Sequence, residues 1–293
     1  MSEASRERVL VVGAGLMGSG IAAQCALAGH DVVLEDVSEA FVTTGVGRAR
    51  RALDHAVERG EVDAARRDQA LARIAPQVGV DGGGAVTIVV EAAPEDLALK
   101  RRLFADIERA VPSSAILASN TSSLPIASIG AGLKAPERLV GLHFFNPVLQ
   151  MPLVELVAAA RSGPGVVAAA GRFAVELGKT VVRSADTPGF VTSRAVAALI
   201  NEAARMLEEG VAVPEDIDAA HRLGFHHPMG PFELVDLIGI DTTVAILDVL
   251  HAGLHDERYR AAAVLRRKVA EGKLGRKSGE GFYRYPAKGG RRP

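Results

Sequence analysis

Short apolar runs alternate with longer amphipathic segments along the first two thirds of the chain. The runs that predict strands are Val9–Val12, Asp31–Leu34, Val86–Val90, Ala115–Ser119, Leu139–His143, Leu153–Ala158 and Thr180–Arg183. The segments that predict helices are Leu16–Ala28, Leu97–Ala110, Val166–Leu177 and two long helices between Ser38 and about Ile74, broken near Arg59 and Gly60. Strands that alternate with helices predict a doubly wound, mostly parallel sheet of the Rossmann type.

The pattern changes after Thr187-Pro188-Gly189, where strand candidates cease. Four helices are predicted beyond it, over Phe190–Glu209, Asp216–Leu223, Pro231–Leu250 and Arg258–Glu271. We therefore expect an α/β domain over residues 1–185 and an all-helical C-terminal domain over residues 186–293. A chain of 293 residues is long enough for two domains of ordinary size.

The charge, the cysteine content and the hydrophobicity of the chain argue against a nucleic-acid-binding, a disulfide-bonded or a membrane-spanning protein. The formal net charge is −1, so no overall positive field draws the protein to nucleic acid or to an anionic membrane surface. The single cysteine, Cys25, excludes an intramolecular disulfide, and we expect a cytoplasmic location. Val9–Gly29 is uncharged over about the length of a membrane span, but its five glycines and Gln24 favour a strand, a turn and a helix. No membrane span is expected.

A glycine loop directly follows the first predicted strand and opens the first predicted helix. Gly13-Ala14-Gly15-Leu16-Met17-Gly18 has the spacing GxGxxG. In this setting the first glycine permits a tight turn, the second lets the backbone approach a pyrophosphate, and the third allows close packing of the helix on the strand. The helix N-terminus then faces the phosphates. The residues expected to bind a dinucleotide are Gly13, Gly15, Leu16, Met17 and Gly18.

An acidic residue stands where the ribose of a dinucleotide would lie. Asp36 follows the second predicted strand, 18 residues after Gly18, and a carboxylate there accepts hydrogen bonds from ribose hydroxyls. The same charge repels a 2′-phosphate, which predicts NAD rather than NADP, and Glu35 adds to this preference if it faces the site. The residues alone leave open an FAD site, or glycines that serve only the turn.

His143 is a candidate general base, because histidine titrates near neutral pH. It ends a predicted strand, at the edge where open α/β sheets bind ligands. A lone histidine beside two phenylalanines is also typical of a packed core residue. Ser122, in a polar run, is also typical of a turn or a helix cap.

Further sequence blocks follow the glycine loop in order. They are Ser119-Asn120-Thr121-Ser122-Ser123-Leu124, Gly141-Leu142-His143-Phe144-Phe145-Asn146-Pro147, Leu153-Val154-Glu155-Leu156, Thr187-Pro188-Gly189-Phe190, His227-Pro228-Met229-Gly230-Pro231-Phe232-Glu233-Leu234 and Gly275-Arg276-Lys277-Ser278-Gly279-Glu280-Gly281-Phe282-Tyr283. The set, from about Val9 to Tyr285, resembles the L-3-hydroxyacyl-CoA dehydrogenase family, and within it the short stand-alone 3-hydroxybutyryl-CoA dehydrogenases. The resemblance implies a Rossmann-type domain, a helical domain through which subunits form a homodimer, and reversible oxidation of the 3-hydroxyl group of an acyl-CoA by NAD.

Carried over residue by residue, the resemblance assigns roles to individual side chains. It makes His143 the catalytic base, Glu155 the carboxylate that orients it, and Ser122 a contact to the substrate oxygen. The residues implied as cofactor contacts are Glu95, Lys100, Asn146 and Lys277, and Arg59 is implied as a contact to CoA. A carboxylate on a strand, as at Glu155, is equally typical of an outward-facing residue.

One position departs from the family pattern. The helix after the Thr-Pro-Gly-Phe block usually carries an asparagine that helps to hold the substrate, and this chain has Ser193 there. Serine keeps donor and acceptor capacity but is shorter. We expect Ser193 to line the pocket, and Ser193→Ala to lower turnover by less than His143→Ala does.

Two other functions are weighed against this one. The 3-hydroxyacid dehydrogenases act on free carboxylates and generally use a catalytic lysine, but the segment Phe190–Glu209 contains no lysine. A dinucleotide-binding protein without activity is the second alternative, and the presence of both His143 and Glu155 argues against it. No metal is expected, because His226-His227 has no further ligands at suitable spacing and favours a turn before Pro228.

Overall fold

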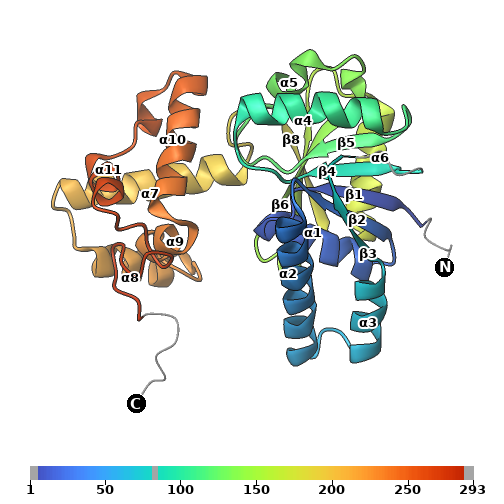
Figure 1. Cartoon of the computed structure of the whole chain (residues 1–293). Helices are drawn as coiled ribbons and strands as arrows, with labels where there is room; N and C mark the ends of the chain where they lie inside the picture. Colours follow the sequence, from blue (N-terminus) through green and yellow to red (C-terminus); the bar gives the residue numbers. More distant parts are fainter. Residues whose placement is uncertain (1–5, 81–84, 287–293) are drawn as a thin grey trace. The chain divides into compact units, whose positions relative to one another are not determined.

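The computed structural model describes residues 6–80 and 85–286. The chain divides between Thr187 and Pro188 into two compact units, two residues beyond the boundary expected from the sequence. The first unit is an α/β domain and the second consists of helices (Figure 1). The predicted fold class is therefore confirmed.

The first unit is built on one sheet. Its strands are β1 (Arg8–Val12), β2 (Asp31–Asp36), β3 (Ile74–Val78), β4 (Ile88–Glu91), β5 (Ile116–Ser119), β6 (Leu139–Phe144), β7 (Leu153–Ala158) and β8 (Thr180–Ala185). They lie in the order β3-β2-β1-β4-β5-β6-β7-β8, and all neighbours are parallel except β6 and β7, which are antiparallel. The first six strands have the order of dinucleotide-binding folds, which bind ligands at the carboxyl ends of the strands.

Helices cover both faces of this sheet. They are α1 (Leu16–Leu27), α2 (Glu39–Glu58), α3 (Ala64–Ala72), α4 (Leu97–Ala110), α5 (Ile126–Ile129) and α6 (Pro164–Glu176). Side chains of α1 and α6 share one core cluster, and α4 and α5 lie together on the other side (Figure 1). Ser38, Asp63 and Asp96 accept hydrogen bonds from first-turn N–H groups, which explains where α2, α3 and α4 begin.

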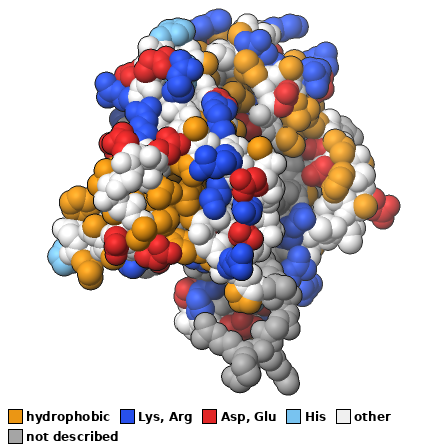
Figure 2. Space-filling model, turned by 90° about the vertical axis from the view of Figure 1, so that its left-hand side faces the viewer, with side chains coloured by type: hydrophobic (Ala, Val, Ile, Leu, Met, Phe, Trp, Pro, Cys, Tyr) orange, Lys and Arg blue, Asp and Glu red, His pale blue; other side chains and the backbone are white. Residues whose placement is uncertain are grey.

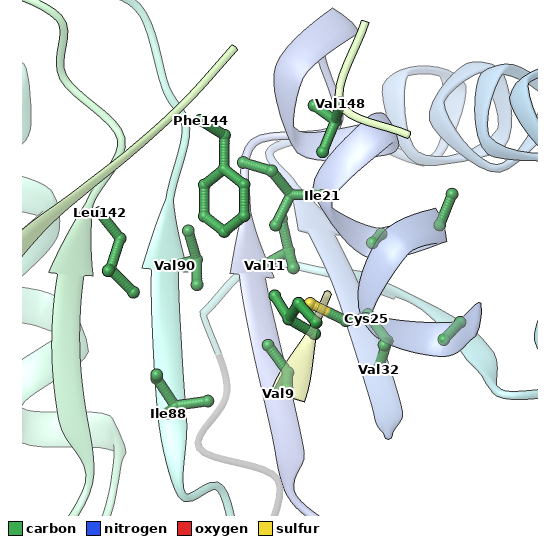
Figure 3. Packing of buried hydrophobic residues seen from close by; sticks show 14 of the residues in the cluster. Val9, Val11, Ile21, Cys25, Val32, Ile88, Val90, Leu142, Phe144 and Val148 are labelled. Carbon is green, nitrogen blue, oxygen red and sulfur yellow. The ribbon is translucent and has the colours of Figure 1, made fainter. Parts of the chain in front are cut away.

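The core under α1 consists of small and branched apolar side chains. Val9 and Val11 of β1 point toward Ile21 and Cys25 of α1, as Figure 3 shows. Cys25 is fully buried, and burial raises the pKa of its thiol to about 12. The thiol is therefore neutral at physiological pH and acts as a small apolar group in the packing. This core fixes the first turn of α1, and with it the glycine loop, against β1.

Strand β3 was not predicted, because Pro76 lies in its middle and proline lacks the N–H group that a central strand needs. The structure places β3 at the edge of the sheet. Arg73 O accepts a hydrogen bond from Val32 N, and Gly79 N donates one to Asp36 O. The backbone groups of the odd-numbered residues along β3 therefore face β2, and those of the even-numbered residues face outward. Pro76 therefore faces away from the sheet, where its missing donor costs no ladder hydrogen bond.

The second unit packs its helices around a separate apolar core. They are α7 (Thr192–Glu208), α8 (Pro214–Phe225), α9 (Pro231–Ile238), α10 (Ile240–Leu254) and α11 (Ala263–Ala270). The prediction of one helix over Pro231–Leu250 was wrong, since Gly239 has a φ of +109° and bends the chain by 96°. No single helix in the described residues is long and apolar enough to cross a membrane; only α9 and α10 pass such a test, as a bent pair.

The helix predicted over Arg258–Glu271 was also wrong in its first part. A short 3-10 turn at Glu257–Tyr259 and an extended segment precede α11. The side chain of Asn201 on α7 donates to the carbonyl oxygens of Arg258 and Arg260 and accepts from Ala262 N. These three bonds from one buried amide hold the segment in its extended form, a tertiary effect that local sequence does not reveal.

Candidate active site

The glycine loop has a shape that leaves backbone exposed at the carboxyl end of β1. Gly13 has a φ of +100°, and a Cβ on it would lie 2.9 Å from the backbone of Ala92. A Cβ on Gly18 would overlap the carbonyl oxygen of Gly13. By contrast, apart from Gly15 itself and its neighbours along the chain, no atom of the described residues lies within 4 Å of the position that a Cβ on Gly15 would take. The loop is thus packed tightly on one side and open at Gly15.

The open side coincides with the N-terminus of α1. Within the described residues no side chain caps this helix, and its first turn carries no acidic residue. The first N–H groups of a helix attract anions, most strongly when no side chain satisfies them. The loop therefore fits the pyrophosphate of the predicted NAD, with the backbone at Leu16 and Met17 on the approach.

Asp36 lies beside this loop at the end of β2. Its Oδ2 accepts a hydrogen bond from Ala14 N at 2.8 Å and its Oδ1 one from Val37 N at 2.7 Å. Glu35 is buried instead, and burial, followed by the nearby charge of Asp36, raises the pKa of its carboxyl to about 7. Glu35 thus carries only part of a negative charge at neutral pH. Asp36 is the carboxylate suited to select the cofactor.

His143 and Glu155 face each other across the antiparallel strands β6 and β7. The register pairs them directly, so that both side chains leave the sheet on the same face. His143 Nδ1 lies 2.8 Å from Glu155 Oε2, and the side chains are 9% and 0% exposed. A carboxylate only accepts hydrogen bonds, so Nδ1 carries the proton and Nε2 is the basic nitrogen. Glu155 is therefore not an outward-facing strand residue.

Ser122 lies in the loop after β5, which Glu95 organises. Glu95 Oε1 accepts from the Thr121 hydroxyl at 2.6 Å and from the backbone N–H groups of Ser122 and Ser123, both at 3.1 Å. Burial opposes the charge on Glu95, but the ammonium of Lys100 and these hydrogen bonds outweigh it and lower the pKa of Glu95. Glu95 is thus an anion that fixes the backbone around Ser122.

Asn120 joins this loop to the strand that carries His143. Its side-chain oxygen accepts from Phe144 N at 2.8 Å, and its own N–H donates to Glu91 O at 2.8 Å. Sequence reasoning assigned it no role. Its position one residue after a buried strand, at the carboxyl edge of the sheet, is the signal that points to it.

The other predicted site residues lie in different surroundings. Asn146 is exposed and lies two residues after the end of β6. Lys100 is buried, and its Nζ donates to Glu91 Oε1 at 2.6 Å. Arg59, at the end of α2, bonds with two nitrogens to Glu61 at 2.7 and 2.8 Å. The helical unit holds Ser193, buried in the first turn of α7, and Lys277, bonded to Asp241.

Metal ligation finds no support in the described part of the chain, which contains no group of three or more His, Cys, Asp or Glu side chains placed to hold an ion. His226 ends α8 in a left-handed conformation, with a φ of +55°. The helix thus ends directly before His227 and Pro228.

Comparison with known proteins covers almost the whole chain. Residues 8–187 match the model of the 3-hydroxyacyl-CoA dehydrogenase NAD binding domain, and residues 189–285 match that of the 3-hydroxyacyl-CoA dehydrogenase C-terminal domain. A probable 3-hydroxybutyryl-CoA dehydrogenase of Bacillus subtilis is 42% identical over 96% of this chain and 98% of its own length. Two solved structures are similar. FadB2 of Mycobacterium tuberculosis has a TM-score of 0.94 and 42% identity, and the match covers 97% of this chain and 100% of FadB2. (S)-3-hydroxybutyryl-CoA dehydrogenase PaaH1 of Ralstonia eutropha has a TM-score of 0.92 and 41% identity, and the match covers 96% of this chain and 100% of PaaH1.

Proposed function

Because the chain belongs to the 3-hydroxyacyl-CoA dehydrogenase family, we propose that it reversibly oxidises the 3-hydroxyl group of an L-3-hydroxyacyl-CoA. We further propose a short acyl chain, 3-hydroxybutyryl-CoA, as the substrate, in keeping with the names of the relatives that match over their full length. The observation that carries the proposal is the buried pair of His143 and Glu155 at the carboxyl edge of a dinucleotide-binding sheet.

The chemistry of the pair follows from its geometry. His143 Nε2 removes the proton of the 3-hydroxyl group, and the resulting imidazolium keeps its second proton on Nδ1, against Glu155. The buried carboxylate stabilises that positive charge, as in other base and carboxylate pairs. NAD, when bound, accepts the hydride that leaves C3. In the reverse direction the imidazolium returns its proton to the oxygen of the 3-oxo group.

The remaining residues take supporting roles in this proposal. The Ser122 hydroxyl exchanges its 3.4 Å contact with Glu95 Oε1 for a hydrogen bond to the substrate oxygen. Asn146, exposed at the same edge, and Lys277 contact the cofactor. Arg59 gives up its bonds to Glu61 and binds the phosphates of CoA in their place. Ser193 lines the substrate pocket. A cytoplasmic location stays a prediction.

One assay tests the reaction class. Purified protein is mixed with acetoacetyl-CoA and NADH, and the loss of NADH absorbance is followed. The same measurement is repeated with NADPH and with free acetoacetate. We expect rapid loss with NADH and the CoA ester only. Consumption of NADH with free acetoacetate would support a free-acid dehydrogenase, and binding of NADH without consumption would support a non-catalytic protein.

Asp36 sets the preference for NADH over NADPH. Asp36→Ala is expected to raise the KM for NADH by about 10- to 100-fold, because hydrogen bonds to a charged group contribute about 1.5–3 kcal/mol. The KM for NADPH should fall, since the repulsion of its 2′-phosphate is removed. Steady-state kinetics with both cofactors measures the two effects. Glu7→Ala, at the opposite end of β1, is the control, and an unchanged ratio of the two KM values in Asp36→Ala would contradict the role.

The helical unit offers a surface for a homodimer. Large apolar side chains are exposed on it, at Val211, Val213, Leu223, Phe225 and Leu237. Figure 2 shows apolar side chains gathered on the face of the molecule turned to the viewer. Single exposed apolar residues are common, but five large ones on one unit of about 100 residues favour a covered surface. We propose that a second copy of the chain covers these residues.

Light scattering after size-exclusion chromatography tests the dimer. Leu223→Glu with Phe225→Glu is expected to convert a dimer of the parent protein into a monomer, because two buried charges oppose association. Val175→Glu, at an exposed apolar position of the first unit, should leave the dimer intact. A monomeric parent protein, or a dimer that survives the double change, would rule out this interface.

A further inference from the structure

A buried lysine holds the chain segment that follows β6. Lys179 lies directly before β8 and is 6% exposed. Its Nζ donates to the carbonyl oxygens of Val148 at 2.6 Å and Met151 at 3.0 Å. No carboxylate among the described residues forms an ion pair with it, and burial lowers the pKa of its ammonium group. A buried charge with backbone oxygens as its partners is costly, and what it fixes is the course of this segment.

The strand directions place Lys179 at the edge of the sheet that carries the candidate site. β7 is antiparallel to β6 and β8 is parallel to β7, so both strands begin at the carboxyl end of β6. His143 lies at this end, next to the last residue of β6. Thr180 N, adjacent to the lysine, donates to Pro152 O at 2.6 Å. The start of β8 therefore anchors the connection between β6 and β7.

The connection, residues 146–151, is a compact turn with Asn146 at its exposed end. Gln150 N and Met151 N both donate to Pro147 O at 3.0 Å. Val148 is buried in the core cluster of the first unit, whereas Asn146 is exposed. Because the turn is closed by its own hydrogen bonds, fixing its two carbonyl groups from below also fixes the residue at its exposed end.

A glycine of α1 holds the same segment from the side. Figure 3 shows Val148 next to α1, and both belong to one core cluster. A Cβ on Gly20 would lie 2.9 Å from Val148 Cγ2, which is closer than side chains pack. The missing side chain at Gly20 therefore leaves the notch in which Val148 sits. Gly20 follows the last glycine of the loop by two residues, so the segment is fixed against the helix that carries the loop.

We propose that Lys179 is a positioning residue for the reaction. It acts through the 146–151 segment, whose exposed Asn146 it holds in place, and it touches neither cofactor nor substrate itself. Gly20 serves the same placement from α1. The inference rests on the proposed function, because the position of Asn146 matters for turnover only if Asn146 contacts the cofactor.

Lys179→Met tests the proposal, because it nearly keeps the size of the side chain and removes both hydrogen bonds. We expect the Kd for NADH, measured by fluorescence titration, to rise about 3- to 10-fold, the usual contribution of one hydrogen bond. The kcat/KM for NADH should fall about 10- to 100-fold, since a small misplacement near the reacting groups costs that much. The KM for acetoacetyl-CoA should stay within about twofold, because its proposed contacts lie outside the segment.

Arg138→Met is the matched control. Arg138 is also buried, at 7% exposure, and donates to the carbonyl oxygens of Ala115 at 2.9 Å and Pro112 at 2.7 Å. It lies directly before β6, at the opposite edge of the sheet. Arg138→Met should therefore lower the temperature of thermal unfolding, as Lys179→Met does, but leave the Kd for NADH unchanged.

The dependence on Asn146 separates positioning from a general structural role. Asn146→Ala is expected to raise the Kd for NADH by itself. Lys179→Met added to Asn146→Ala should raise it little further, because both changes act on one contact. Lys179→Gln keeps an N–H donor for the carbonyl groups and should restore part of the affinity that Lys179→Met loses. A merely structural lysine would give the same loss with and without Asn146.

If Lys179→Met does not fold, Gly20→Ala reaches the same segment from α1. Alanine suits a helix, and its Cβ displaces Val148. The Kd for NADH should rise, and this rise should again vanish in the Asn146→Ala background. Parent affinity for NADH in the folded variants, or a rise that persists with Asn146→Ala, would overturn the inference. A parent protein that binds NADH but is inactive with acetoacetyl-CoA would overturn the proposed function instead.

Discussion

Replacing His143 by glutamine is expected to lower kcat for acetoacetyl-CoA reduction by about 10²- to 10⁴-fold, the usual contribution of a general acid or base. Glutamine has nearly the size of histidine and supplies a hydrogen-bond donor to Glu155, so the buried site stays filled. It has no group that exchanges a proton near neutral pH. The affinity for NADH, measured by fluorescence titration, should stay within about threefold, because the glycine loop and Asp36 are unchanged.

Ser193→Ala is the comparison for this prediction. It should lower turnover by less than the change at His143, since serine assists binding and moves no proton. Equal kinetics of Ser193→Ala and the parent protein would remove Ser193 from the pocket. A His143→Gln variant that keeps more than a tenth of the parent kcat would require another base.

Glu155→Gln is expected to produce the second-largest loss, about 100-fold or more in kcat, by altering which nitrogen of His143 carries the proton. The amide group of glutamine is able to donate to Nδ1, which places the proton on Nε2 and removes the basic nitrogen from the substrate side. Single-turnover kinetics with NADH and acetoacetyl-CoA measures the chemical step directly.

The control for this variant is Glu176→Gln, an exposed carboxylate on α6 that should leave kcat unchanged. Thermal unfolding checks that the loss is chemical, since Glu155 lies in the sheet. A Glu155→Gln enzyme with parent kcat would mean that the strand pairing alone orients the imidazole.

Much of the fold could be predicted from local sequence. The glycine loop between a four-residue apolar run and a helix of small residues identified the first βαβ unit, because this geometry depends on neighbouring residues. Gly239 shows the limit, since a single glycine inside an apolar segment does not reveal that the chain turns sharply there. The extended segment before α11 was missed for a related reason, because Asn201 holds it from a distant helix.

The candidate site shows the same division. His143 was a candidate base from its chemistry and its place at a strand end, and Glu155 was found through a family resemblance. Their direct pairing depends on the antiparallel register of β6 and β7. A spacing of twelve residues does not fix that register. Lys179 and Asn120 were missed because their partners lie on other strands and loops. Spatial neighbours of this kind follow from strand order, which the hydrophobic pattern does not specify.

Pro76 on the outermost strand has a consequence for the behaviour of the protein in solution. An exposed strand edge is a template on which another chain can add a strand, and such additions lead to aggregates. At the middle of β3 the outward row of donors is interrupted by a residue that has none to offer. A foreign strand would lose a hydrogen bond at the centre of its contact. Pro76 thus protects this border of the sheet against uncontrolled growth at high protein concentration.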